Sequence, residues 1–260
     1  MNHVIFHELP ILTSKDPRKI RVLLPKDYHT TQKKYTVLYM HDGQNLFDDT
    51  TAYGGHSWGI PKILNDLQID DVIVVGIDNS DLRLFEYAPW KSSELVKEIF
   101  NVELGGLGDV YADFVINQVK PFIDHTYRTL KDFKHTWIAG SSMGAYISVY
   151  IAVKYPHLFG GVGCFSLASW FNEDDFLTFI KNTPISKSQR YFISIGDNET
   201  SDEKKKDFNL RYLENSRSLK SLLEKLGVFD ICYIETHDVH NELAWRKMFS
   251  PFIKWMIYKA

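Results

Sequence analysis

Cysteine is scarce in this sequence, and the shortage argues against a secreted protein stabilised by disulfides. The two cysteines, Cys164 and Cys232, lie in the apolar runs GVGCFSL and DICYIE, which are typical of buried strands. A bridge between them stays open, but two buried thiols in a reducing compartment explain the sequence better. The N-terminal segment MNHVIFHELPIL lacks the basic start and the long apolar core of a signal peptide. We therefore expect a cytoplasmic protein.

Long apolar runs and an excess of one charge are also missing. No apolar stretch reaches the roughly 18–20 residues that a membrane-spanning helix needs. The formal net charge is only -3, and the basic run KKK at 204–206 is bracketed by Asp202, Glu203 and Asp207. These features give no reason to expect nucleic acid or an anionic membrane as a partner.

No internal repeat, low-complexity tract or Pro/Gly-rich linker divides the chain, so we expect one domain over residues 1–260. Short apolar runs alternate with amphipathic segments, and several runs are apolar without alternation, as in strands that helices cover on both faces. This order predicts an α/β fold with a mainly parallel sheet. The predicted strands are 20–25, 35–42, 71–78, 135–141, 161–168, 190–197 and 230–235. The predicted helices are 58–67, 109–124, 142–154, 208–226 and 241–259, and the polar stretch 79–109 predicts a loop over the sheet edge.

Polar and titratable residues follow most of the predicted strands. In parallel sheets, ligands bind outside the carboxyl ends of the strands. The segments at these ends are HDGQ (41–44), DN (78–79), GSSMG (140–144), GDNE (196–199) and HDVH (237–240). Their accumulation at one edge predicts a site there.

The segment GSSMG fits the G-x-S-x-G pattern of a nucleophile elbow, with Ser142 at its centre. The pattern alone is weak, because a tight glycine-rich connection also explains it. The predicted strand before it and the predicted helix after it strengthen the interpretation. In such a turn the serine hydroxyl projects from a strained backbone, and the helix N-terminus favours negative charge in front of it. The backbone N–H of Met143 then points to where an oxyanion forms.

A serine nucleophile needs a base and an acid that orients the base, in the chain order Ser, acid, His. The strand RYFISIG is followed by three carboxylates that can supply the acid: Asp197, Glu199 and Asp202. The next strand is followed by two histidines, His237 and His240. Asp197 suits a role in the turn itself, and Asp202 is expected to face solvent beside the lysine run.

Together these stretches resemble the esterase family of α/β-hydrolases that includes enterochelin esterases, feruloyl esterases and esterase D. The resemblance covers nearly the whole chain. It rests on VLYMHDGQNLFD (37–48), VVGIDN with R and EY (74–87), GDVYADFVINQVKPFIDHTYRT (108–129), IAGSSMGAYISVYIAVKYPHLFGGVGCFSLASW (138–170), GDNE (196–199) and HNELAWR (240–246). It implies an α/β-hydrolase fold. We expect neither a cofactor nor a metal.

The resemblance also implies roles for single residues. Ser142 corresponds to the nucleophile and Glu199 to the acid of the triad. His240 corresponds to the base, because the family's histidine precedes a Trp-Arg pair as His240 precedes Trp245 and Arg246. His237 is a weaker rival of His240.

The loop HDGQN occupies the place of the family's oxyanion loop, where many members have a His-Gly pair. Asp42 stands where that glycine would be, which leaves open whether Gly43 or Gln44 donates its N–H alongside Met143.

Three residues are weaker candidates for substrate binding: Asn79, Arg83 and Trp170. Asn79 is equally well explained as a polar strand end that satisfies its own turn. We expect Arg83 to pair with Glu86 on the surface. If it points inward instead, it would favour a substrate that carries a carboxylate or phosphate. Trp170 follows the strand next to the elbow, whereas most other aromatic residues are expected in the core.

These features predict a serine carboxylesterase that hydrolyses a small or medium ester through an acyl-enzyme on Ser142. Its partner is then a small-molecule ester. An acyltransferase with the same triad is the first alternative. A metal-dependent hydrolase is disfavoured because the histidines and carboxylates show no recognisable ligand spacing. A binding protein without activity is disfavoured because no triad role is vacant.

Overall fold

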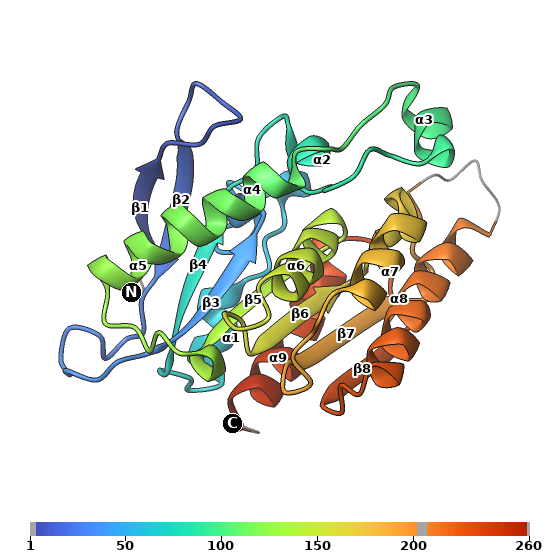
Figure 1. Ribbon diagram of the computed structural model, residues 1–260. Coiled ribbons are helices and arrows are strands. Elements are labelled where there is room, and N and C mark those ends of the chain that lie inside the picture. The colour runs from blue at the N-terminus through green and yellow to red at the C-terminus, as the bar shows by residue number, and fades with distance from the viewer. Residues whose placement is uncertain (1–3, 202–206, 259–260) are drawn as a thin grey trace.

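A computed structural model describes residues 4–201 and 207–258 of the chain (Figure 1). Its centre is an eight-stranded sheet in the order β1-β2-β4-β3-β5-β6-β7-β8. β2 runs antiparallel to β1 and β4, and all other neighbours pair in parallel. The prediction of a mainly parallel sheet is confirmed. The strands are β1 Val4–Leu9, β2 Arg18–Leu23, β3 Thr36–His41, β4 Val72–Ile77, β5 Thr136–Ser141, β6 Gly161–Phe165, β7 Arg190–Gly196 and β8 Ile231–Thr236.

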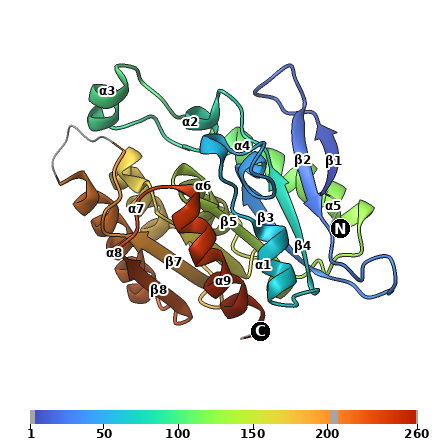
Figure 2. The ribbon, with the colours of Figure 1, turned by 180° about the vertical axis from the view of Figure 1, so that it is seen from behind.

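Helices cover both faces of the sheet, as Figures 1 and 2 show. α4 to α8 lie on one face, and α1 and α9 lie on the other. The helices are α1 Ile60–Asp66, α2 Arg83–Glu86, α3 Glu94–Phe100, α4 Gly108–Phe114, α5 Lys120–Thr126, α6 Met143–Lys154, α7 Glu173–Asn182, α8 Phe208–Lys225 and α9 Glu242–Tyr258. α4 and α5 are joined by a π-helical turn, Val115–Val119, so the predicted helix 109–124 is one continuous helical segment.

The sheet divides the hydrophobic core into two halves. The larger half contains the sheet residues that face α4 to α8, such as Ile138 and Ile193. The smaller half lies under α1 and α9 and contains Trp58, Phe165 and Phe252. β4 to β6 are buried along their whole length, which explains why their sequences are apolar without alternation. α6 is also buried almost completely, because it lies directly on the sheet.

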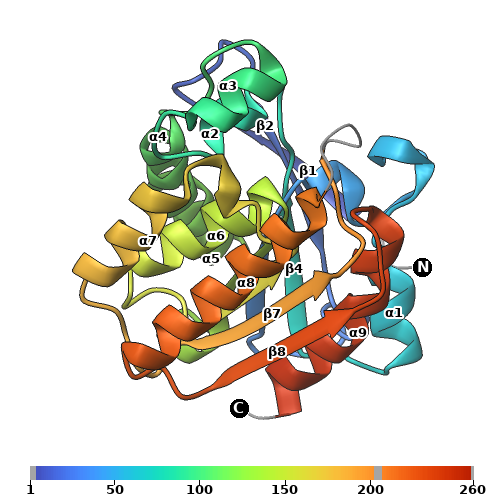
Figure 3. The ribbon, with the colours of Figure 1, turned by 90° about the vertical axis from the view of Figure 1, so that its right-hand side faces the viewer.

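All seven predicted strands and all five predicted helical segments are present. Two further elements are not among the predicted ones: β1, which is a half-exposed edge strand, and α7. α7 did carry a start signal, because the side chain of Asn172 caps the helix by accepting a hydrogen bond from the N–H of Asp175. The stretch 79–109 was predicted as a loop but contains α2 and α3, which lie at the top of the molecule in Figure 3.

Cys164 lies on β6 and is fully buried, and Cys232 lies on β8 and is partly buried. β7 separates their strands in the sheet. Within the described residues, none of the helices combines the length and the apolar character that crossing a membrane requires.

Candidate active site

Ser142 lies at the sharp turn between β5 and α6. Its backbone has φ 57° and ψ -121°, a conformation that a residue with a side chain adopts only under strain. A Cβ on Gly140 would lie 2.6 Å from the backbone of Gly144, so the strand and the helix meet too closely there for any larger residue. The N–H of Ser142 donates to the carbonyl of Phe165 at 2.9 Å, which fixes the turn to β6.

The first turn of α6 begins directly after Ser142, with Met143 as its first residue. The N–H groups in the first turn of a helix have no partner within the helix and carry partial positive charge. The N–H of Met143 is therefore suited to stabilise an anion that forms beside Ser142.

His240 is hydrogen-bonded to Glu199, with 2.8 Å between Nδ1 and Oε2. An ionised carboxylate only accepts hydrogen bonds, so Nδ1 of His240 donates to Glu199, and in the neutral imidazole Nε2 has a free lone pair. The Glu199 side chain is 2% exposed and that of His240 is 15% exposed. The pair is thus almost closed to water on the carboxylate side and open on the imidazole side.

The other oxygen of Glu199, Oε1, accepts two hydrogen bonds. The hydroxyl of Ser166 donates at 2.6 Å and the backbone N–H of Gly196 at 2.7 Å. The Ser166 hydroxyl itself accepts from the indole N–H of Trp245 at 2.8 Å. These donors hold the carboxylate in one orientation and compensate for its burial.

Two aromatic rings enclose the imidazole of His240. The ring of Tyr212 lies 4.8 Å from it, centroid to centroid, and the ring of Trp245 lies 5.1 Å away at nearly a right angle. Burial raises the pKa of Tyr212 to about 12, so its hydroxyl stays protonated. Tyr212 and Ser166 were not among the predicted site residues, and Tyr212 lies outside the stretches that carry the family resemblance.

The rivals for the acid and the base lie elsewhere. Asp197 contacts His237, with 2.6 Å between Oδ2 and Nδ1, and the side chain of His237 is 95% exposed. The carboxylate of Asp197 also accepts from the side-chain amide of Asn198. The predicted role of Asp197 in bonding backbone N–H groups of its turn is replaced by these side-chain contacts. Asp202 lies outside the described residues.

The predicted oxyanion loop follows β3. Asp42 has φ 57° and ψ 47°, the left-handed conformation, and Gly43–Asn45 form a short 3₁₀ turn, η1. A Cβ on Gly43 would lie 2.7 Å from both Gly76 and the Asp78 carboxylate, so Gly43 sits tightly against the end of β4. The side chain of Gln44 accepts a hydrogen bond from the N–H of Asn79 at 3.1 Å.

A cavity of about 340 Å³ opens between this loop, the elbow and the start of α9. Its lining brings together Ser142 and His240 with Gln44, Asn79 and Arg83, which the sequence analysis proposed for the site. The lining also contains residues that it did not propose: Asp42, Asn45, Tyr53, Ser141, Glu242 and Trp245. Every one of these side chains carries a group that can form hydrogen bonds, so the cavity offers many polar contacts.

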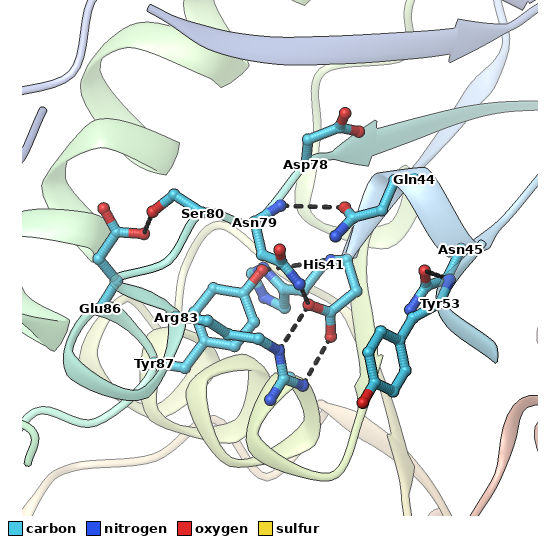
Figure 4. A network of polar contacts seen from close by, with 12 residues as sticks. His41, Gln44, Asn45, Tyr53, Asp78, Asn79, Ser80, Arg83, Glu86 and Tyr87 are labelled. Carbon is cyan, nitrogen blue, oxygen red and sulfur yellow. Dashed lines mark hydrogen bonds and ion pairs between the residues drawn. The ribbon is translucent and has the colours of Figure 1, made fainter. Parts of the chain in front are cut away.

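Arg83 points inward and pairs with Asp42. Its Nε and Nη2 donate to the two carboxylate oxygens at 2.7 and 2.8 Å. The expected surface pair between Arg83 and Glu86 is wrong, because Glu86 is fully buried and binds Arg18 of β2 at 2.8 and 3.0 Å. Figure 4 shows Asn79, Arg83 and Tyr87 gathered around His41, at the end of β3, and Gln44, in the turn that follows it.

Of the other two weaker candidates for substrate binding, Asn79 lines the cavity and Trp170 does not. Asn79 donates from its side-chain amide to Asp42 at 2.6 Å, while the preceding Asp78 binds Arg21 of β2. Trp170 is buried beneath the site, where it packs against Phe208 and Tyr212 and is not part of the cavity lining. The tryptophan that lines the cavity is Trp245, which the sequence analysis used only to identify His240.

The described residues contain no group of three or more His, Cys, Asp or Glu side chains that could hold a metal ion. His41 is fully buried, its Nδ1 lies 2.8 Å from the Tyr111 hydroxyl, and burial lowers its pKa to about 3. His41 is therefore neutral at physiological pH and belongs to the support of the loop.

Comparisons with known proteins bear on the family and the fold. The family model described as "Putative esterase" matches residues 13–256. The uncharacterized protein YbbA of Bacillus subtilis (strain 168) is 25% identical over 245 residues, which are 93% of each chain. Among solved structures, a ferulic acid esterase superposes with a TM-score of 0.74 at 17% identity over 99% of both chains. The BES protein from Bacillus cereus superposes with a TM-score of 0.75 at 14% identity, over 98% of this chain and 95% of that one.

Proposed function

The chain belongs to the Putative esterase family and is a hydrolase that acts on carboxylic ester bonds, and we propose that it does so through an acyl-enzyme on Ser142. In this proposal Ser142, His240 and Glu199 form the triad. The observation that carries it is that Ser142 and His240 line the same cavity while His240 is bonded to the buried Glu199.

His240 acts first as a base. Its Nε2 takes the proton from the Ser142 hydroxyl as Oγ attacks the ester carbonyl. Glu199 holds the proton on Nδ1, so the lone pair of Nε2 is available to the serine, and it stabilises the imidazolium that forms. The leaving alcohol then takes the proton from Nε2, and the acyl group stays on Ser142.

Deacylation repeats these steps with water. His240 takes a proton from a water molecule, whose oxygen attacks the acyl carbon, and returns the proton to Ser142 Oγ as the acid leaves.

The negative charge on the carbonyl oxygen needs two N–H donors. Met143 supplies one from the first turn of α6. For the second donor we favour Gln44 over Gly43, because Gln44 lines the cavity whereas Gly43 is packed against the end of β4.

The cavity also bears on the substrate. A volume of about 340 Å³ is at the small end of ligand sites, which supports a short acyl group on a small alcohol. The polar groups of the lining support an alcohol or acyl part that forms hydrogen bonds.

An ester panel tests the proposal. Initial rates are measured with p-nitrophenyl esters of graded acyl length, for the wild type and for Ser142→Ala. We expect acetate and butyrate to react faster than octanoate, and we expect the variant to be inactive on all of them. Activity that survives in the variant overturns the proposal. The acyltransferase alternative is tested in the same assay by adding an alcohol and measuring the transferred ester.

A further inference from the structure

Asp42 occupies an unfavourable position for a side chain that carries charge. It is buried, it precedes the proposed oxyanion donors, and its backbone is left-handed at φ 57°. Aspartate tolerates this conformation better than most residues, but glycine adopts it freely. Something in the structure must therefore compensate for both the backbone and the buried carboxylate.

The single helical turn α2 and the residue that follows it, Tyr87, contact Asp42 at its side chain and its backbone. Arg83 binds the carboxylate through two hydrogen bonds of 2.7 and 2.8 Å. The hydroxyl of Tyr87 accepts a hydrogen bond from the backbone N–H of Asp42 at 3.2 Å. Arg83 and Tyr87 are four residues apart and so share a face of the helix, and the guanidinium lies 5.0 Å from the centroid of the Tyr87 ring.

α2 is itself fixed to the sheet. Glu86 binds Arg18 of β2 through two hydrogen bonds, and these side chains are 0% and 4% exposed. Arg18 also donates to the backbone carbonyl of Asp78, at the end of β4, at 3.0 Å. The contacts to Asp42 therefore come from a rigid support.

The charge of Arg83 is matched by Asp42. Burial would raise the pKa of the Asp42 carboxyl, but the charge and hydrogen bonds of Arg83 outweigh burial and the pKa is lowered. Burial would likewise lower the pKa of Arg83, and Asp42 raises it instead. Arg83 therefore brings no unmatched positive charge to the cavity for a substrate anion.

Asp42 lies between the two halves of the proposed oxyanion hole. Its carbonyl accepts the N–H of Asn45 at 2.9 Å and so shapes η1, which contains Gln44. On the other side, its Oδ2 lies 3.2 Å from the position of a Cβ built on Gly144, in the first turn of α6. A shift of Asp42 would move Gln44 relative to Met143.

We propose that Arg83, supported by Tyr87, is a positioning residue that orients the oxyanion loop through Asp42 and does not bind the substrate. This inference rests on the proposed function. It predicts that Arg83 is needed only while residue 42 is an aspartate, because glycine would hold the left-handed turn without a partner.

A double-mutant comparison tests this. Arg83→Met, which keeps the length of the side chain without its charge, should lower kcat by about 10², the effect of losing one oxyanion donor, while KM changes by less than about threefold. The kcat of the double variant, Asp42→Gly with Arg83→Met, should lie within about fivefold of the kcat of Asp42→Gly alone, because no carboxylate is then left for Arg83 to bind. The affinity for a boronic acid that mimics the tetrahedral intermediate should follow kcat across the set, and a purely structural role would not produce that parallel.

Several results of these experiments would contradict the inference. The inference is wrong if the kcat of the double variant is as low as that of Arg83→Met. It is also wrong if Arg83→Met slows the hydrolysis of esters that carry a carboxylate far more than that of neutral esters, because Arg83 then acts on the substrate. If Arg83→Met does not fold, Asp42→Gly is compared with the double variant, and a loss of tenfold or more between them overturns the inference. Wild-type activity that does not depend on Ser142 would instead refute the proposed function.

Discussion

Replacing Glu199 by glutamine should inactivate the enzyme, because it should move the proton of the His240 imidazole from Nδ1 to Nε2. Oε1 of Glu199 accepts hydrogen bonds from Ser166 and from the backbone N–H of Gly196. The backbone donor cannot turn away, so the amide oxygen of the substituted side chain must take this position. The amide NH₂ then faces Nδ1 of His240, which has to accept. The proton moves to Nε2, where it blocks transfer from Ser142.

The size of the effect follows from this tautomer change. In the serine-protease precedent, an amide in place of the triad carboxylate lowers kcat by about 10⁴. At 1.36 kcal/mol per factor of ten, this is about 5.4 kcal/mol of transition-state stabilisation. KM should change little, because Glu199 is buried behind His240 and does not line the cavity.

The assay is kcat and KM for a p-nitrophenyl acetate substrate, with Asp197→Asn as the matched control. Asp197 follows the same strand but pairs with the exposed His237, so its variant should stay within a few-fold of the wild type and act, if at all, on stability. A kcat within tenfold of the wild type for Glu199→Gln, with the fold intact, would refute the reasoning. Asp202→Asn serves as a second control and is expected to be silent.

Three further results are expected. The value of kcat/KM should rise with pH, since only the neutral imidazole of His240 accepts the Ser142 proton; a flat profile with chemistry rate-limiting would count against His240 as base. His41 has a pKa of about 3 when folded and 6.5 when unfolded, so the unfolded chain binds the extra proton as the pH falls below 6.5. The free energy of unfolding should therefore drop by about 2 kcal/mol from pH 7 to pH 5 through this residue, and His41→Asn should remove that part of the slope in denaturant titrations. Glu86→Ala leaves the buried Arg18 without its charge partner and should lower the free energy of unfolding by about 3–5 kcal/mol. Glu103→Ala, which breaks surface pairs with Lys91 and Lys97, should leave the denaturation midpoint nearly unchanged.

Much of the fold could be predicted because local sequence and tertiary environment agree. The central strands are covered on both faces, so their apolar runs mark them directly. β1 was missed because an edge strand with one exposed face has a weak pattern, and α2 and α3 were missed because they are short and surrounded by polar residues.

The candidate site was predictable where a role is tied to a position in the chain. Ser142 needs glycines two residues away on either side, and His240 and Glu199 follow strands that end at the same edge.

The partners of these residues could not be read from the sequence. Arg83 and Glu86 are three residues apart, which favours a pair between them. The fold instead pairs Arg83 with Asp42 and Glu86 with Arg18. Nothing in the sequence around Ser166 or Tyr212 indicates their partners, and only the packing of β6 and α8 brings them to Glu199 and His240.

The central claim is that Ser142 is the nucleophile, and covalent labelling tests it most directly. The wild type and Ser142→Ala are treated with a fluorophosphonate probe, and the modified peptide is sequenced by mass spectrometry, with circular dichroism to verify that both proteins are folded. We predict one adduct, on Ser142, in the wild type and none in the variant. An adduct on Ser141 or on another serine, or labelling that persists in Ser142→Ala, would contradict the account.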